Sequence, residues 1–442
     1  MRTKIRPRTL LTRFGAAALV LLTAVATVSV SDDSAAAGRP AGPAGNADDR
    51  PPADHVVFLG LDGFDYEYLD DVPMPNLQDL LRRGTVAKSR GVMTSITNPS
   101  WSSIATGAWP ATHRNTAYWF DKSTHTARGQ QRDLAVPTVA QSIREQGGTV
   151  FSSQWFIVQN YGTSYGDTEG LYTDGGDCPT RVGRAVAVME GRPVSSGGKD
   201  VTLPRIPELM AAYCDDLDAL GHAGGSIHPE IPDRLRMIDE QIGRLVQAAR
   251  NAGIYDRTAF VITGDHGMTT FQQGMAPELL KAIGDAGYQA EILTSGKQPG
   301  PGTDAALVIG GSGDLTLLGD AADDPWALPR IRRAVESLPH VAATYDKRTQ
   351  KRMHMSLNHG DLVIEPEEGW SLGETTPAPV GRHGTTQELD VPLVLAGAGV
   401  SKWIKPWHPR HIDIAPTMSA LLGMEPPAGA EGRVLRESVR PR

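Results

Sequence analysis

The chain has 442 residues, of which 40% are hydrophobic, 21% charged and 6% aromatic. This length and apolar content exclude a disordered tail and a disulfide-stapled mini-protein, and they predict one large domain or a large domain with a smaller one. Lys and Arg number 43 against 51 Asp and Glu, so the formal net charge is -8. Because a negative chain has no bulk attraction for nucleic acid, we expect no nucleic-acid-binding module.

The N-terminal residues have the pattern of an export signal. Basic residues precede an uncharged stretch, 14–31, and small residues follow it up to Ala37. This pattern predicts a signal peptide over residues 1–37 and a secreted protein with no stable membrane association after cleavage. The alternative is a membrane anchor through residues 14–31, which is near the lower spanning limit of about 17 residues. Residues 38–54 are rich in Gly, Pro, Ala and Asp, which predicts a flexible linker.

Only two cysteines are present, Cys178 and Cys214. They are compatible with one disulfide or with two buried thiols, because the bond depends on how close the fold brings their Cα atoms. Neither lies in a C-x-x-C or zinc-finger spacing, so we expect no cysteine-ligated metal.

Strand and helix patterns alternate from His55 onwards. Residues 55–61 and 258–263 are continuous apolar runs typical of buried strands, and residues 149–152 are a third candidate. Helices are predicted at 75–83, 137–146 and 230–253, the last with apolar residues at regular helical spacing. The alternation predicts an α/β fold with a central, mostly parallel sheet and helices on both faces.

Residues 271–380 interrupt this alternation. A candidate helix at 326–338 lies among candidate strands at 288–293, 305–309, 341–345 and 361–364. We expect a smaller inserted α+β lobe here, in which His354 and His359 have no assigned role. The flanking residues, 55–270 and 381–425, are predicted to form the main domain, which resumes with a strand at 391–396 and ends with a helix at 413–422.

Acidic and histidine side chains follow two of the predicted strands. Asp62 comes directly after the first strand, and Asp265 and His266 come after the strand at 258–263. In open α/β sheets, ligands bind beyond the carboxyl ends of the strands, so these side chains are candidate ligand-binding residues. Taken singly, each also suits a plain turn or a hydrogen-bonded structural histidine.

Two further places bring a carboxylate or an imidazole next to glycines. Asp218 and His222 are four residues apart, and the glycines around them favour a loop that turns around a bound ion. His383 lies between Gly381 and Gly384, just before a predicted strand. Together with the strand-end residues, these form a set of three Asp and three His that suits Zn²⁺ or a similar divalent ion, and two ions better than one.

Thr97 is a candidate nucleophile. It stands just before Pro99, which suits the first turn of a helix. A hydroxyl at such a terminus meets backbone N–H groups and a partial positive charge, both of which can hold a phosphoryl oxygen. The alternative is simple helix capping, for which Thr is also favoured.

These motifs occur in a characteristic order, which is Leu61-Asp62-Gly63-Phe64, Thr97-Asn98-Pro99, Asp218 to His222, Thr263 to Met268, and His383-Gly384. In this order they resemble the type I phosphodiesterase/nucleotide pyrophosphatase family of the alkaline phosphatase superfamily. The resemblance covers roughly His55 to Gly423. It implies an alkaline-phosphatase-like fold and a phosphoric ester hydrolase that acts on a small phosphate-ester substrate.

The resemblance also implies two metal sites and a mechanism. One site would use Asp218, His222 and His383, and the other Asp62, Asp265, His266 and the oxygen of Thr97. Two divalent ions and three aspartates leave one positive charge, which a Thr97 alkoxide would neutralise. A metal-bound hydroxyl is nucleophilic near neutral pH, so the expected reaction is in-line displacement through a phospho-threonine intermediate.

Two positions depart from the family pattern. Members that cleave nucleotide diesters carry an Asn about twenty residues beyond the Thr, whereas counting 21 from Thr97 reaches Tyr118. Asn115 is close by, so we expect Asn115 or Tyr118 to contact the substrate. Ser100 stands where the family often has Asn, and nucleotide specificity therefore stays open.

Other functions share parts of this pattern. A phosphomonoesterase or a phosphonoacetate-type phosphonate hydrolase would use the same metal core, and Thr97-Asn98-Pro99 also resembles the latter. A sulfatase is not expected, because the segment lacks the Cys and Arg of a formylglycine pattern. The non-enzyme alternative is a secreted metal-binding protein without turnover. The sequence does not predict an oligomeric state.

Overall fold

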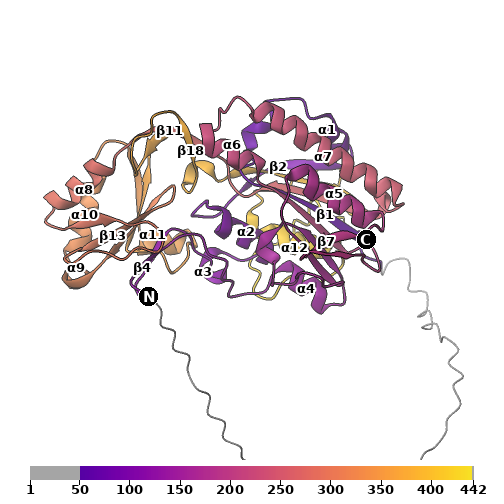
Figure 1. Ribbon diagram of the computed structural model, residues 1–442, viewed down its shortest axis with the longest axis horizontal. Helices are drawn as coiled ribbons and strands as arrows, with labels where there is room; N and C mark the ends of the chain where they lie inside the picture. The colour runs from indigo at the N-terminus through magenta and orange to yellow at the C-terminus, as the bar shows by residue number, and fades with distance from the viewer. Residues whose placement is uncertain (1–49, 441–442) are drawn as a thin grey trace, which may run out of the picture. The chain divides into compact units, whose positions relative to one another are not determined.

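The computed structural model describes residues 50–440 (Figure 1). The predicted signal peptide, 1–37, and residues 38–49 of the predicted linker lie outside this range. Ala53 is fully buried, and its N–H donates to the carbonyl of Leu421 at 2.8 Å, so packing begins before the first strand. Within residues 50–440, no helix has the length and apolar content needed to span a membrane.

A seven-stranded sheet forms the centre of the fold. Its strands, in spatial order, are β2 (Gly84–Arg90), β19 (Asp390–Gly397), β10 (Thr258–Gly264), β1 (His55–Leu61), β9 (Leu209–Cys214), β5 (Val150–Ser153) and β6 (Gly170–Thr173). All neighbours pair in parallel except β19, which runs antiparallel to both β10 and β2. The predicted mostly parallel sheet is therefore confirmed, with one reversed strand.

Helices cover both faces of this sheet (Figure 1). One face packs against α1 (Pro75–Leu81), α5 (Cys178–Met189) and α7 (Ile231–Asn251), and the other against α2 (Thr97–Thr106), α4 (Val139–Glu145) and α12 (Ile414–Leu421). Strand β1 shows why its sequence is apolar throughout. Val57 and Leu59 join one core and Val56 and Phe58 the other, so the strand is buried on both sides.

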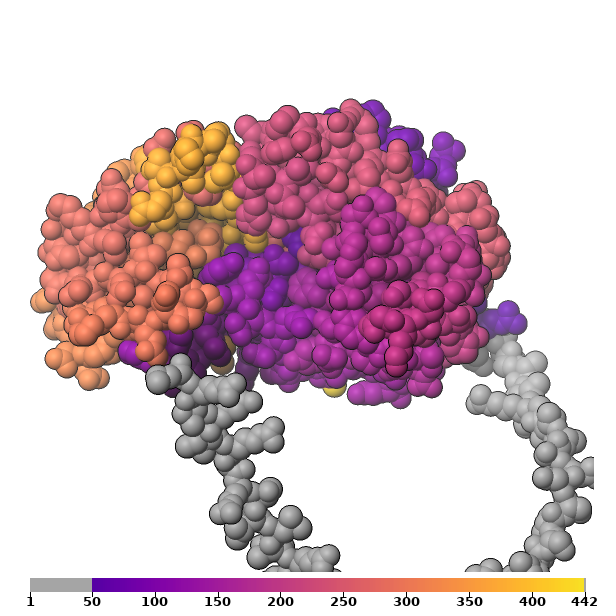
Figure 2. Space-filling view, in the orientation of Figure 1, coloured from indigo at the N-terminus to yellow at the C-terminus, as the bar shows by residue number. Residues whose placement is uncertain are grey.

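The inserted lobe has its own sheet of five strands, in the order β12 (Ala290–Ile292), β13 (Ala305–Ile309), β14 (Gly313–Leu317), β16 (Leu362–Pro366) and β15 (Val341–Asp346). Helices α8 (Ala276–Asp285) and α10 (Ala327–Glu336) cover one face. A hairpin from earlier in the chain, β3 (Trp119–Asp121) and β4 (Thr126–Arg128), covers the other through Phe120 and Ala127. The space-filling view shows this purple hairpin against the orange lobe (Figure 2).

A small sheet joins the lobe to the central sheet. It consists of β17 (Gly369–Ser371), β11 (Thr269–Gly274) and β18 (Val380–Arg382). Strand β11 starts three residues after His266, and β18 ends one residue before His383. The chain therefore leaves for the lobe and returns from it directly beside two candidate ligands.

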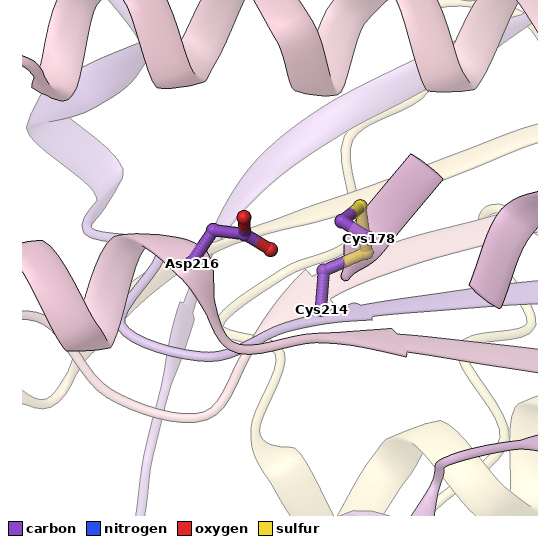
Figure 3. Close-up of side chains that lie close together, drawn as sticks. All are labelled: Cys178, Cys214 and Asp216. Atoms are coloured by element: carbon purple, nitrogen blue, oxygen red, sulfur yellow. A yellow bond between two sulfur atoms is a disulfide. The ribbon is translucent and has the colours of Figure 1, made fainter. Parts of the chain in front are cut away.

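A disulfide joins α5 to the end of β9. Cys178 and Cys214 are bonded with an S–S distance of 2.06 Å, so the disulfide alternative is the one that the structure contains (Figure 3). Asp216, beside the bond in Figure 3, pairs with Arg234 at 3.0 Å. Because α6 (Asp216–Gly224) starts directly after Cys214, the bond fixes the strand end from which this helix extends.

His113 is a fully buried histidine that is held neutral. The N–H of Asn115 donates to its Nδ1 at 3.1 Å, and its Nε2 lies 3.0 Å from the hydroxyl of Ser103. A proton on Nδ1 would break the bond from Asn115. Burial also disfavours the charged ring, and the pKa of His113 falls from 6.5 to about 3.

We expect His113 to make the fold sensitive to acid. Below pH 6.5 the histidine is protonated in the unfolded chain, whereas in the folded protein it stays neutral down to about pH 3. The free energy of unfolding therefore falls with falling pH, by up to about 1.4 kcal/mol per pH unit. Urea unfolding of chelator-treated protein at pH 7 and pH 5 measures this slope. His113→Gln should reduce it and His125→Gln, at an exposed position, should not. An equal slope in the wild type and His113→Gln contradicts the assignment.

Candidate metal and nucleophile site

Three aspartates lie at one edge of the central sheet. Asp62 follows β1, Asp265 follows β10, and Asp218 lies in the first turn of α6, just after β9. The strand ends are level, because Leu61 is in register with both Gly264 and Cys214. The parallel pairing of β1 with β10 and β9 therefore brings the three carboxylates together.

Asp218 and His222 lie on a helix, so the predicted loop around an ion was wrong. On α6 they are one turn apart, and His222 Nε2 is 3.4 Å from Asp218 Oδ1. Gly221 does not turn the chain. It allows close packing, since a Cβ at this position would lie 2.6 Å from the Cε of Met268. The helix ends at Gly224, and the capping residue Gly225 has a φ of 79°, which suits glycine.

Asp218, His222 and His383 form one donor set. His383 Nε2 lies 3.5 Å from Asp218 Oδ1 and 3.2 Å from His222 Nε2. The Nδ1 atoms face backbone carbonyls, that of Ser95 at 2.9 Å for His383 and that of Gly381 at 3.3 Å for His222. An Nδ1–H that donates to a carbonyl leaves the lone pair on Nε2, which is the form of histidine that binds metals.

Asp62, Asp265 and His266 form a second, fully buried donor set. His266 Nε2 lies 3.3 Å from Asp62 Oδ1 and 3.2 Å from Asp265 Oδ2, while its Nδ1 faces the carbonyl of Gly267 at 2.9 Å. The two sets are adjacent, because the rings of His266 and His383 stack with centroids 3.6 Å apart. The structure thus brings all six sequence-predicted ligands into one cluster.

The carboxylates of this cluster suit bound cations. Asp62 Oδ1, Asp218 Oδ1 and Asp265 Oδ2 are buried, and within residues 50–440 they have no hydrogen-bond partner outside the cluster, whose histidine Nε2 atoms approach them to between 3.2 and 3.5 Å. Burial and the charge of Asp62 raise the pKa of Asp218 to about 6 and that of Asp265 well above its usual value. Burial also acts on Asp62, but its hydrogen bond with His266 and the charge of His266 outweigh it and lower its pKa. Buried anions that lack partners are costly, so the donor set fits divalent cations.

Thr97 is positioned by α2 to face the second donor set. It is the first residue of the helix, whose N-cap is Ile96, and no side chain caps this end. Its Oγ1 lies 3.3 Å from His266 Nε2 instead. In this turn the Asn98 N–H donates to Gln130 Oε1 at 3.0 Å and Pro99 has no N–H, so neither residue offers a free N–H to a phosphoryl oxygen.

Asn115 and Tyr118 lie in different surroundings. Asn115 is fully buried, and its Nδ2 donates to Ser102 Oγ at 2.7 Å and to the Asn98 carbonyl at 3.3 Å. It therefore braces α2, and its expected contact with substrate is not supported. Tyr118 is half-buried, and its hydroxyl forms a hydrogen bond with Gln130. Burial, and in smaller part the charge of Asp218, raise the pKa of this hydroxyl.

Three residues of the site were missed by the sequence analysis. Tyr213 donates its hydroxyl to Asp62 Oδ2, and Trp101 Nε1 lies 3.5 Å from the same oxygen. Tyr213 belongs to β9, whose apolar run before Asp215 was a readable strand signal. Gln130 connects Tyr118 to the start of α2, and nothing in its sequence surroundings marks it.

We expect Tyr213→Phe to weaken metal binding without unfolding the protein. Burial and the charge of Asp62 raise the pKa of Tyr213 well above its usual value, so its hydroxyl stays a donor that orients Asp62. Losing such an orienting bond typically costs 10- to 100-fold in metal affinity. Competition with a chromogenic chelator measures this, and Tyr172→Phe, a buried tyrosine of β6, is the matched control. Equal affinities in the two variants would remove Tyr213 from this role.

Comparisons with known proteins identify the family of the chain. The sequence model of the family described as Type I phosphodiesterase / nucleotide pyrophosphatase matches residues 56–386. The bis(5'-adenosyl)-triphosphatase of Mus musculus is 23% identical over 416 residues, which cover 86% of this chain and 80% of the relative. The ectonucleotide pyrophosphatase/phosphodiesterase family member 7 of Homo sapiens is 25% identical over 239 residues, 49% of this chain and 48% of the relative.

Solved structures share the fold. Human ectonucleotide pyrophosphatase/phosphodiesterase 5 superposes with a TM-score of 0.66 at 17% identity, covering 84% of this chain and 96% of that one. An inactive form of the murine protein in complex with AMP gives the same TM-score of 0.66 at 16% identity, with the same coverage. The predicted fold class is thereby confirmed. From the match over most of its length, the chain belongs to the type I phosphodiesterase/nucleotide pyrophosphatase family.

Proposed function

We propose that the protein is a metal-dependent phosphodiesterase/nucleotide pyrophosphatase that transfers the phosphoryl group through Thr97. Family membership supports a hydrolase of phosphodiester or pyrophosphate bonds. The observation that carries the finer proposal is the position of Thr97 Oγ1, 3.3 Å from His266 Nε2 and beside two sets of acidic and imidazole donors.

Two divalent ions, Zn²⁺ or similar, match the donor chemistry. One would be held by Asp62, Asp265 and His266 with the oxygen of Thr97, and the other by Asp218, His222 and His383. Carboxylate oxygens and neutral imidazoles suit zinc, and the unpartnered carboxylate oxygens support cation binding. When bound, such ions polarise phosphoryl oxygens and lower the pKa of a coordinated hydroxyl.

The chain's own residues would act as follows. Thr97 gives up its hydroxyl proton to solvent water, and its oxygen attacks phosphorus as the bond to the leaving oxygen breaks and that oxygen takes a proton from water. Water then attacks the phospho-threonine, the bond between phosphorus and the Thr97 oxygen breaks, and Thr97 regains a proton. Tyr213 keeps Asp62 in place throughout. Tyr118 and Gln130, next to the start of α2, would contact the substrate where the family pattern has Asn.

Nucleotide polyphosphate esters are the substrate class that the relatives favour. One relative is named a bis(5'-adenosyl)-triphosphatase, and one structural neighbour was solved with AMP. Phosphomonoesterase and phosphonate hydrolase activities are the rivals, because they would use the same donor sets.

Side-by-side rates decide among these activities. Purified protein with added Zn²⁺ is given bis(p-nitrophenyl) phosphate, bis(5'-adenosyl) triphosphate, p-nitrophenyl phosphate and phosphonoacetate. We expect the first two to be cleaved at least tenfold faster than the others. Acid quenching during turnover, followed by peptide mass spectrometry, should locate on Thr97 a phosphoryl group that still carries its second ester substituent, p-nitrophenyl from the first substrate or adenosyl from the second. Faster cleavage of the monoester or of phosphonoacetate would transfer the assignment to that rival, and full metal occupancy without turnover would favour the binding-protein alternative.

We also propose that the protein is exported. The pattern of residues 1–37 supports a cleaved signal, and the bond between Cys178 and Cys214 suits an oxidising compartment. N-terminal sequencing of protein from the culture medium should find a chain that starts just after Ala37. Recovery in the membrane fraction with residues 14–31 intact would support the anchor instead.

A further inference from the structure

A cavity of about 330 Å³ lies where the lobe meets the central domain. The lobe contributes Arg352, at the end of α11 (Lys347–Arg352), with Met353 and His354. The central domain contributes Arg410, Trp109, Leu389 and the segment from Arg90 to Met93. The apolar floor, formed by Val92, Met93 and Leu389, is buried, whereas the three arginines are exposed.

The charge of this cavity is opposite to that of the whole chain. No carboxylate lines it among the residues that the structure describes. Arg90 lies 3.5 Å from Asp390, which also pairs with Lys88 at 3.4 Å. Arg352 donates only to the hydroxyl of Thr349, at 3.0 Å, and Arg410 lies over Trp109 at 5.4 Å. Neither Arg352 nor Arg410 forms a direct ion pair within residues 50–440, although Asp346 lies near Arg352 and Asp413 near Arg410. Both guanidinium groups are therefore free to bind an anion directly.

The wall of the cavity is fixed by contacts between lobe and central domain. Trp109 stacks on His354 with centroids 4.6 Å apart and an interplanar angle of 12°. The His354 carbonyl accepts the N–H of Ala111 at 3.1 Å, and Glu431 accepts the N–H of Trp109 at 2.8 Å. The Arg90 N–H donates to the Pro409 carbonyl at 2.9 Å, which sets Arg410 beside it. Because these wall residues are already ordered, ligand binding would cost little conformational entropy of the protein at the wall.

We propose that this cavity binds an organic phosphate monoester, whose phosphate bridges Arg352 of the lobe and Arg410 of the central domain. A phosphate monoester carries a charge of about -1.5 to -2 near pH 7, which suits two guanidinium groups that have no direct ion pair in the described residues. A planar guanidinium group can donate two parallel hydrogen bonds to two oxygens of one phosphate, which an ammonium group cannot do with the same geometry. The organic part would cover the floor of Met93 and Leu389. The volume lies within the usual range of small-molecule sites, about 300 to 1,000 Å³.

The ligand stoichiometry tests this site, and AMP is the probe. Isothermal titration of the full mature chain with its metals should show one AMP equivalent more in the wild type than in the double variant Arg352→Gln/Arg410→Gln. The difference of one equivalent does not depend on whether the metal cluster also binds AMP, so the test stands apart from the proposed catalysis. Arg333→Gln, an exposed arginine of α10 without an ion pair in the described residues, is the control and should match the wild type.

Companion measurements define the chemistry of the ligand. Arg352→Gln and Arg410→Gln alone should each weaken AMP binding at this cavity about tenfold or more. These single variants keep the test valid if the double variant fails to fold. Inorganic phosphate should compete weakly and adenosine not at all, and binding should weaken as salt is raised. Equal AMP stoichiometry in the wild type and the folded double variant, or competition by adenosine alone, would overturn the proposal.

Discussion

Thr97→Ala should reduce the turnover of a phosphodiester by a factor of about 10⁴ or more, because it removes the only oxygen proposed to attack phosphorus. The loss should appear in kcat and not as a failure to fold. Thr97 is not a helix cap, and its hydroxyl is 3.3 Å from His266 rather than bonded to its own helix. Alanine is also the better helix former, so we expect the free energy of unfolding to change by less than about 0.5 kcal/mol.

Two variants separate this role from capping. Thr97→Ser keeps a hydroxyl and should retain measurable turnover and the phosphoryl-enzyme signal. Thr106→Ala, at the other end of α2, removes a hydroxyl bonded to the Ser102 carbonyl at 2.7 Å and should stay within a few-fold of wild-type activity. If Thr97→Ala lowered stability by about 1 kcal/mol and kept more than a tenth of the activity, Thr97 would be a cap and the nucleophile would lie elsewhere.

The ligands were predictable because each follows a strong local signal. Asp62, Asp265 and His266 come directly after strands buried on both faces, and a continuous apolar run reveals such strands. Parallel pairing then brings their ends to one edge. Strand β2 was missed because it is an edge strand, and its exposed Lys88 and Arg90 hide the apolar pattern.

What could not be predicted depends on contacts between distant parts of the chain. His383 is oriented by the carbonyl of Ser95, 288 positions away, and no local pattern encodes such a pair. Asn115 was expected near the substrate from its offset in sequence, but the fold turns it towards Ser102 inside the protein. The glycines near Asp218 suggested a loop, whereas Gly221 serves close packing against Met268.

Asp265→Asn should have opposite effects on the metal-free and the metal-loaded protein. The side chain is fully buried, and burial together with the charge of Asp62 raises its pKa. In the unfolded chain the same carboxyl is ionised above about pH 4, so in the wild type this group makes the metal-free protein less stable as the pH rises from 4 towards the raised pKa. Asparagine removes that penalty, about 1.4 kcal/mol for each unit of the shift, and keeps an oxygen for the Gly63 N–H, 3.1 Å from Oδ1.

With metal present, the order of stabilities should reverse. A ligand at 100 times its dissociation constant stabilises the folded state by about 2.7 kcal/mol, and the variant, which lacks one anionic donor, should lose most of this gain and most of its activity. Urea unfolding of the wild type and of Asp265→Asn at pH 7.5, each with chelator and with Zn²⁺, gives the four free energies of unfolding that are compared. Asp239→Asn is the matched control, because this buried carboxylate accepts the Leu77 N–H at 2.8 Å and belongs to neither donor set. It should lower stability in both conditions while keeping the full response to Zn²⁺.

One outcome would contradict this role. If Asp265→Asn were less stable than the wild type with chelator and gained as much stability from Zn²⁺, Asp265 would be a structural aspartate. The second donor set would then lack its central carboxylate.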